Sequence, residues 1–173
     1  MSKYLLDANI LISAHRLFYA HDIVPSFWKW LEEMVPENII IIDLVKDELT
    51  VEDDFLSNWV RYLLESNPAN LIHTKSNQDI VNNYADVIDY IGSCGLYKVD
   101  SIEQWMGMNK ADPFLIATAM TRNDIIVTLE KRHSGLNQIT PTKQEPKIPD
   151  VADRFSIECI NLYELMRRLG CEI

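Results

Sequence analysis

The sequence contains little cysteine and no long apolar run, and both absences exclude classes of protein. Its three cysteines form no C-x-x-C pair, and their odd number disfavours a disulfide framework. No apolar segment approaches the ~20 residues needed to cross a bilayer. Residues 1–4 lead directly into an apolar strand, so we expect no signal peptide. The sequence therefore predicts a cytoplasmic protein that has no membrane as a partner.

Glycine motifs and an excess of basic residues are also missing. None of the five glycines lies in G-x-x-x-x-G-K-[ST], G-x-G-x-x-G or G-x-S-x-G, which excludes the usual P-loop, dinucleotide-binding and hydrolase-elbow sites. The net charge is −10, from 16 Lys and Arg against 26 Asp and Glu. This balance opposes a generic nucleic-acid-binding protein, which has a basic footprint. It remains compatible with an enzyme that reaches phosphates through a bound metal, and with a basic protein partner.

The 173 residues, 47% of them hydrophobic, predict a single domain spanning residues 1–173. Apolar strands alternate with amphipathic helices, which predicts an α/β fold with a mostly parallel sheet. The helical stretch 52–107 is expected to form one inserted layer, and residues 134–149 a long loop. The strands are expected at 3–6, 39–42, 71–73, 124–128 and 157–160. The helices are expected at 9–19, 25–36, 44–50, 52–66, 78–91, 101–107, 113–122 and 162–169.

Four acidic residues lie where strands or loops meet helices. Asp7 and Glu130 follow predicted strands, Glu48 lies on the helix after a strand, and Asp112 opens a helix. In a parallel sheet the carboxyl ends of the strands share one edge, where ligands bind. Carboxylates gathered there repel each other, at about 4 kcal/mol for a pair ~4 Å apart at an effective dielectric of 20. Such a cluster indicates a divalent cation, and its oxygen ligands suit Mg²⁺ or Mn²⁺.

Each acidic residue taken alone also has an ordinary structural explanation. Asp7 or Asn9 would cap the first helix through a side-chain oxygen. Asp112 would be the N-cap of a helix with proline at its first position. Glu48 and Glu130 would be solvated charges. It is the order of the four residues and their placement relative to the strands that favour a metal site.

Four segments resemble the motifs of the PIN-domain family of metal-dependent ribonucleases. They are Leu5–Ile12, Val45–Leu49, Ala111–Ala117 and Ile126–Glu130. The last segment departs from the family pattern, which has aspartate where this chain has Glu130. The resemblance covers most of the chain and implies a three-layer α/β/α sandwich with additional helices between residues 52 and 107.

The resemblance also implies the roles of the site residues. Asp7, Glu48 and Asp112 would hold Mg²⁺ or Mn²⁺, and Glu130 would assist. Asn9 and Thr128 would not bind the metal directly but would orient its ligands or a water molecule. The implied activity is hydrolysis of RNA phosphodiester bonds, as in the toxin of a toxin–antitoxin pair. The partners expected are therefore RNA, a basic antitoxin protein and a second copy of the chain.

A short basic cluster follows Glu130. Lys131, Arg132 and His133 would contact the phosphate backbone of a substrate, or would form a solvated turn. Lys143, Lys147 and Arg154 would extend this cluster if the long loop folds back over the site.

Two other functions remain open at this point. One is phosphoryl transfer by an Asp nucleophile of the haloacid-dehalogenase type, although the second acid that such enzymes carry is Asn9 here. The other is a catalytically silent PIN-like binding module, which the Glu130 departure and the acidic surface favour.

Overall fold

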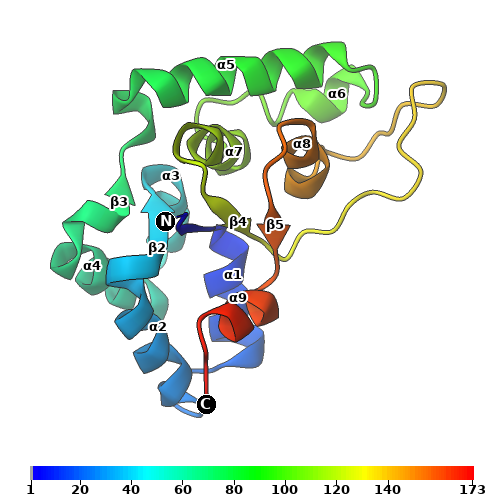
Figure 1. The fold of residues 1–173 in the computed structure, drawn as a ribbon. Helices are drawn as coiled ribbons and strands as arrows, with labels where there is room; N and C mark the ends of the chain where they lie inside the picture. Colours follow the sequence, from blue (N-terminus) through cyan, green and yellow to red (C-terminus); the bar gives the residue numbers. More distant parts are fainter. Residues whose placement is uncertain (1) are drawn as a thin grey trace.

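The computed structural model describes residues 2–173 and is built around a five-stranded sheet in the order β3-β2-β1-β4-β5 (Figure 1). Every neighbouring pair of strands is parallel. This confirms the expected α/β fold and its sheet type. The strands are β1 (Tyr4–Leu6), β2 (Ile39–Ile42), β3 (Leu71–Ile72), β4 (Ile125–Val127) and β5 (Cys159–Ile160).

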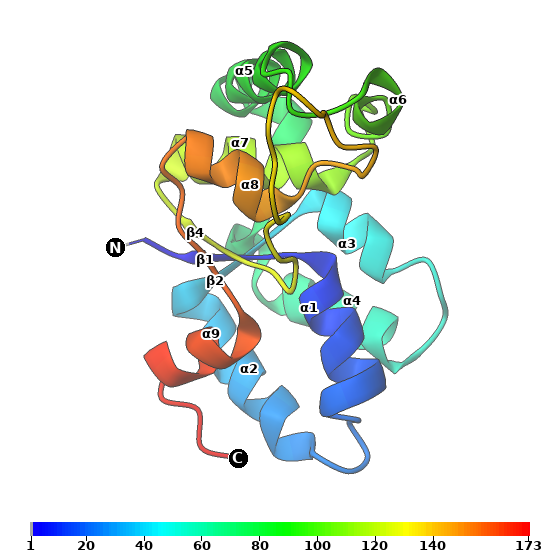
Figure 2. The same ribbon diagram turned by 90° about the vertical axis from the view of Figure 1, so that its right-hand side faces the viewer.

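Helices cover both faces of the sheet, which gives the expected three-layer sandwich (Figures 1 and 2). One layer contains α5 (Gln78–Ser93), α6 (Val99–Ile102), α7 (Ala111–Arg122) and α8 (Ile148–Arg154). The other contains α2 (Pro25–Asn38), α4 (Phe55–Ser66) and α9 (Leu162–Arg168). Two short helices follow the central strands, namely α1 (Ala8–Ser13) after β1 and α3 (Asp43–Leu49) after β2.

The core lies between these layers. All four isoleucines of β2 are buried, as expected for a parallel strand covered on both faces. Tyr84 of α5 stacks on Phe114 of α7 with ring centroids 4.2 Å apart, and Trp28 of α2 meets Trp59 of α4 at 5.0 Å. Each aromatic pair joins two helices of one layer. The polar residues described below lie at the carboxyl ends of the strands.

The stretch 52–107 does not form one inserted layer, contrary to the expectation. Strand β3 lies inside it, and the helices on either side of β3 pack on opposite faces of the sheet (Figures 1 and 2). The indole N–H of Trp59 on α4 donates to Glu32 of α2 (2.6 Å), whereas α5 packs along α7. The chain crosses from one face to the other because the short strand β3 pairs with β2 at the edge of the sheet.

Several helix boundaries also differ from the sequence prediction. The helix at Pro25 continues through Pro36 to Asn38, the first helix ends in a π-helical turn at Ala14–Phe18, and α6 begins at Val99. Helix α8 begins in the last two residues of the expected loop 134–149 and continues to Arg154, where no helix was expected. Among the described residues, no helix is long and apolar enough to span a membrane.

Candidate active site

Asp7 lies at the carboxyl end of β1 and caps α1. Its backbone N–H donates to the carbonyl of Val127 on β4 (3.0 Å), so this hydrogen bond fixes the end of β1 to the end of β4. One carboxylate oxygen accepts from the backbone N–H of Asn9 (3.5 Å) and the other from the hydroxyl of Thr128 (2.8 Å). Asp7 is 3% exposed, whereas Asn9 is exposed. Asp7 is therefore both a helix cap and a buried carboxylate at the ligand-binding edge.

The environment of Asp7 raises its pKa from 3.8 to about 7. Burial is the main cause, and the charges of Asp112 and Glu130 add to it. The hydrogen bonds from Thr128 and from the Asn9 backbone lower the pKa and offset part of the rise. The carboxylates of Asp7, Asp112 and Glu130 are thus close enough to influence one another electrostatically.

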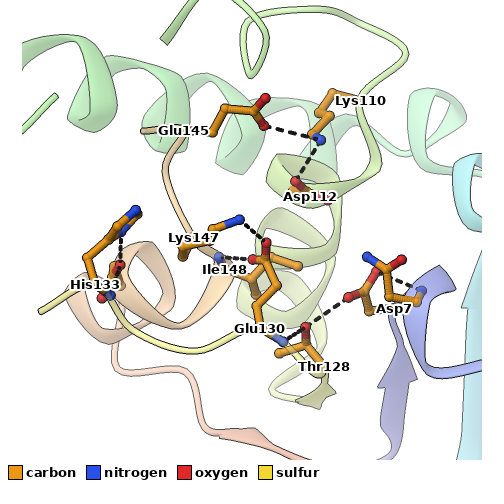
Figure 3. Close-up of polar contacts among 11 residues, drawn as sticks. Asp7, Lys110, Asp112, Thr128, Glu130, His133, Glu145, Lys147 and Ile148 are labelled. Atoms are coloured by element: carbon orange, nitrogen blue, oxygen red, sulfur yellow. Dashed lines mark hydrogen bonds and ion pairs between the residues drawn. The ribbon is translucent and has the colours of Figure 1, made fainter. Parts of the chain in front are cut away.

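Asp112 lies in the first turn of α7, but Lys110 and not Asp112 is the N-cap. The expectation of an Asp112 cap is therefore wrong. Pro113 occupies the third helical position, where its missing N–H would have had no partner within the helix in any case. The ammonium of Lys110 lies 3.1 Å from Asp112 and 3.8 Å from Glu145 (Figure 3). Burial raises the pKa of Asp112, Lys110 opposes the rise, and Glu130 and Glu145 add to it.

Glu130 uses both carboxylate oxygens within the protein. One accepts from the ammonium of Lys147 (2.8 Å) and the other from the backbone N–H of Ile148 (2.7 Å), the first residue of α8 (Figure 3). The backbone N–H of Glu130 donates to the hydroxyl of Thr128 (3.1 Å), so Thr128 links Glu130 to Asp7. Glu130 thereby tethers the segment 131–147 and caps the N-terminus of α8.

Glu48 lies on α3 with its side chain exposed. The neighbouring protein shields the carboxylate from part of the solvent, which raises the pKa of Glu48. The charge of Asp112 raises this pKa further, and the charge of Lys110 lowers it. Glu48 is therefore close enough to Asp112 to sense its charge. We call Asp7, Glu48, Asp112 and Glu130 the acidic cluster.

The acidic cluster has the donor chemistry of a Mg²⁺ or Mn²⁺ site, because all its ligand atoms are carboxylate oxygens. In residues 2–173, however, no three His, Cys, Asp or Glu side chains lie close enough together to hold one metal ion. The ammonium groups of Lys110 and Lys147 provide the positive charge instead. The residues fit a cation chemically, and loading it would require these ammonium groups to give way.

The basic cluster after Glu130 is largely engaged with α8. Arg132 forms two hydrogen bonds to Asp153 (2.7 and 2.5 Å). The backbone N–H and ring Nδ1 of His133 lie 3.1 and 2.7 Å from one Asp150 oxygen, and the His133 side chain is mostly buried. Lys131 is exposed. Arg132 and His133 therefore anchor the segment to α8, and their contact with a substrate stays a prediction.

The sequence analysis missed two charged residues of the site, Lys110 and Glu145. Lys110 stands two positions before Asp112, and this spacing was the only available signal. Glu145 lies in a segment without periodicity and reaches the site only through the path of the loop. The loop folds back over the site, but the three basic residues expected to extend the basic cluster do not act together: Lys147 pairs with Glu130, and Arg154 lies over the ring of Tyr90.

The protein has a PIN-like fold: a parallel sheet in the order β3-β2-β1-β4-β5, with acidic residues at the edge formed by the carboxyl ends of the strands. The chain is similar to VapBC2 from Rickettsia felis bound to a DNA fragment from its promoter, at 18% identity and a TM-score of 0.50, over 91% of this chain and 97% of that chain. It is also similar to FitAB bound to an IR36 DNA fragment, at 16% identity and a TM-score of 0.50, over 91% of this chain and 94% of that chain. These likenesses confirm the expected fold.

A family model described as "Domain of unknown function (DUF4411)" matches residues 4–173, and the chain belongs to this family. No curated protein sequence matches the chain.

Proposed function

We propose that the protein is a metal-dependent ribonuclease that hydrolyses RNA phosphodiester bonds. The observation that carries this proposal is the buried Asp7, whose pKa is raised to about 7 beside Asp112 and Glu130 at the ligand-binding edge of a PIN-like sheet. Strongly perturbed carboxylates in such a place are typical of functional sites. A purely structural role would favour a neutral or fully paired group, because burying an uncompensated carboxylate destabilises the fold.

In this proposal Asp7, Glu48 and Asp112 hold Mg²⁺ or Mn²⁺, and Glu130 assists. When bound, the cation supplies a more acidic water molecule and neutralises charge that develops on the phosphate. Thr128 holds one oxygen of Asp7 and thereby fixes the orientation of the other. Asn9 contributes its backbone N–H to Asp7, and its exposed side chain stands beside the site.

The two lysines of the site give the proposal a further feature. Lys110 and Lys147 compensate the carboxylates while no cation is bound. With a divalent cation compensating the carboxylates, Lys110 and Lys147 would be free to turn towards the scissile phosphate. There they would bind phosphate oxygens, as basic side chains do in nucleic-acid complexes.

We also propose that the protein acts as the toxin of a toxin–antitoxin pair, with a basic antitoxin as its inhibitor. The net charge of −10 would steer such a partner towards the protein. The acidic cluster already accommodates ammonium groups, so a Lys or Arg of a partner would fit the same chemistry. Co-purification from the native host, followed by an activity assay of the complex, tests the pairing. Recovery of a lone, fully active protein at low salt would leave the antitoxin without support.

A catalytically silent binding module is the competing function. The lysine contacts, and the lack of three ligating side chains close together within residues 2–173, favour it. The deciding experiment is incubation of mixed RNAs with purified protein, with and without Mn²⁺.

The same assay is run on Asp112→Asn, with Asp86→Asn as the control. Asp86 is an exposed carboxylate on α5, outside the acidic cluster. We expect Mn²⁺-dependent cleavage by the wild type and by Asp86→Asn, and none by Asp112→Asn. Equal cleavage by all three proteins would exclude Asp112 from the site, and no cleavage by any of them would favour the silent module.

A further inference from the structure

A concave surface lies at the same edge of the sheet as the acidic cluster. It has a volume of about 430 Å³, and Thr128 and Glu130 belong to its lining, so it opens directly beside the cluster. The ends of β4 and β5 and the start of α9 form its walls. We call it the β5 cavity, and the lining residues that matter below are Leu129, Arg132, Pro149, Ile160, Asn161 and Tyr163.

One wall of the β5 cavity is aromatic and the others include apolar side chains. Tyr163, the second residue of α9, is 50% exposed. Its hydroxyl is close enough to Tyr19 to add to the rise in the pKa of Tyr19, which is caused mainly by burial. Tyr19 in turn stacks on the buried Phe27 at 4.3 Å. Tyr163 is thus supported from the interior while half of its side chain stays accessible to a ligand.

The rim of the β5 cavity carries hydrogen-bond donors and positive charge. The side-chain oxygen of Asn161 caps α9 by accepting from the backbone N–H of Glu164 (2.9 Å), which leaves the NH₂ group of Asn161 as a donor. Arg132 is fixed at the rim by Asp153, and Lys131 beside it is exposed. An occupant with a flat unsaturated ring, hydrogen-bond acceptors and an attached phosphate would match these groups.

We propose that the β5 cavity binds one nucleobase of single-stranded RNA, next to the phosphate that lies at the acidic cluster, and that Tyr163 stacks on this base. The proposal rests on the ribonuclease function. A net charge of −10 gives no general attraction for a polyanion, so affinity must come from local contacts. Stacking on an aromatic side chain is such a contact, and it is tolerant of sequence because every base has a π-face.

The test is the dissociation constant of a short, fluorescently labelled single-stranded RNA with a non-hydrolysable backbone, measured by anisotropy in millimolar Mn²⁺, so that binding is separate from cleavage while a cation is available to the carboxylates. The proteins are the wild type, Tyr163→Leu, Tyr163→Phe and the control Tyr62→Leu. Tyr62 is 62% exposed on α4, in the helical layer opposite to α5 and α7, and does not line the cavity. We expect Tyr163→Leu to bind about tenfold more weakly than the wild type, and the other two variants to bind like the wild type.

A second RNA with an abasic backbone supplies the matching ligand control. The wild type should bind it as weakly as Tyr163→Leu binds the normal RNA. Equal affinity of Tyr163→Leu and the wild type, or no measurable RNA binding by the wild type, would overturn the base site and leave the cavity to a protein partner. Tyr163-dependent binding without metal-dependent cleavage would support the base site and refute the nuclease. Metal-dependent cleavage together with an unchanged dissociation constant in Tyr163→Leu would support the nuclease and refute the base site.

Discussion

Replacing Asp7 by Asn should stabilise the metal-free protein at alkaline pH and destabilise it at acidic pH. The pKa of Asp7 is raised from 3.8 to about 7, so the folded state binds its proton more tightly than the unfolded chain does. The free energy of unfolding therefore falls as the pH rises from about 4 to about 7, and stays low above that. The neutral amide of Asn removes this dependence.

The size of the effect follows from the pKa difference. A rise from 3.8 to about 7 corresponds to a destabilisation of about 4 kcal/mol when Asp7 is ionised. Asn can still accept from the hydroxyl of Thr128 but offers one acceptor oxygen in place of two, and a lost hydrogen bond costs about 1 kcal/mol. We therefore expect Asp7→Asn to be more stable than the wild type by about 2–3 kcal/mol near pH 8. It should be less stable by about 1 kcal/mol near pH 4.

Urea unfolding in EDTA at both pH values measures this difference, and Asp124→Asn is the matched control. Asp124 is also buried, at 5% exposure, but it lies at the opposite edge of the sheet and accepts from Arg122 (2.6 Å) and from the backbone of Lys3 (2.8 Å). Its replacement should destabilise the protein by about 1–3 kcal/mol near pH 8, because Arg122 loses its partner. If Asp7→Asn were less stable than the wild type near pH 8, the ionised Asp7 carboxylate would not destabilise the fold as its raised pKa implies.

Two further outcomes follow from the same site. Millimolar Mn²⁺ should raise the melting temperature of the wild type, by the equivalent of about 2.7 kcal/mol at a hundred times the Kd. It should raise the melting temperature of Asp7→Asn much less. Equal shifts of the two proteins in differential scanning fluorimetry would place the metal elsewhere. Lys147→Met should remove the ammonium group that pairs with Glu130. Because Lys147 is partly exposed, this should lower the free energy of unfolding by less than about 1 kcal/mol. It should also speed amide hydrogen exchange in residues 131–147. Unchanged exchange there would show that the tether rests on Ile148 alone.

The sheet could be predicted from the sequence because its strands are short apolar runs between polar residues. Residues 39–42 are the clearest case, four isoleucines that are all buried in β2. Helix α8 could not be predicted in the same way. It has seven residues, and its first N–H is satisfied by Glu130, which lies 18 positions earlier. A helix that depends on so distant a contact leaves little local pattern.

The same distinction applies to the candidate site. Asp7 and Asp112 were found because each stands at a junction between elements, which is visible in a single stretch of sequence. The partners of these carboxylates were harder to find, since Glu145 meets Lys110 from a position 35 residues later along an irregular path. The Asp112 cap was wrong because an Asp–Pro pair suits the second and third helical positions as well as the cap and the first.

The balance of charge in the site explains how the lysine contacts and a metal function can coexist. The acidic cluster and Glu145 supply five carboxylates, and Lys110 and Lys147 supply two ammonium groups, which leaves a formal charge of −3 when all are ionised. Protonation of Asp7, whose pKa is about 7, reduces the deficit to −2. A single divalent cation carries the same charge as the two ammonium groups together, so it could replace them without changing this balance. The raised pKa of Asp7 follows mainly from its burial, to which the charges of Asp112 and Glu130 add, and a cation bound beside Asp7 would lower it again.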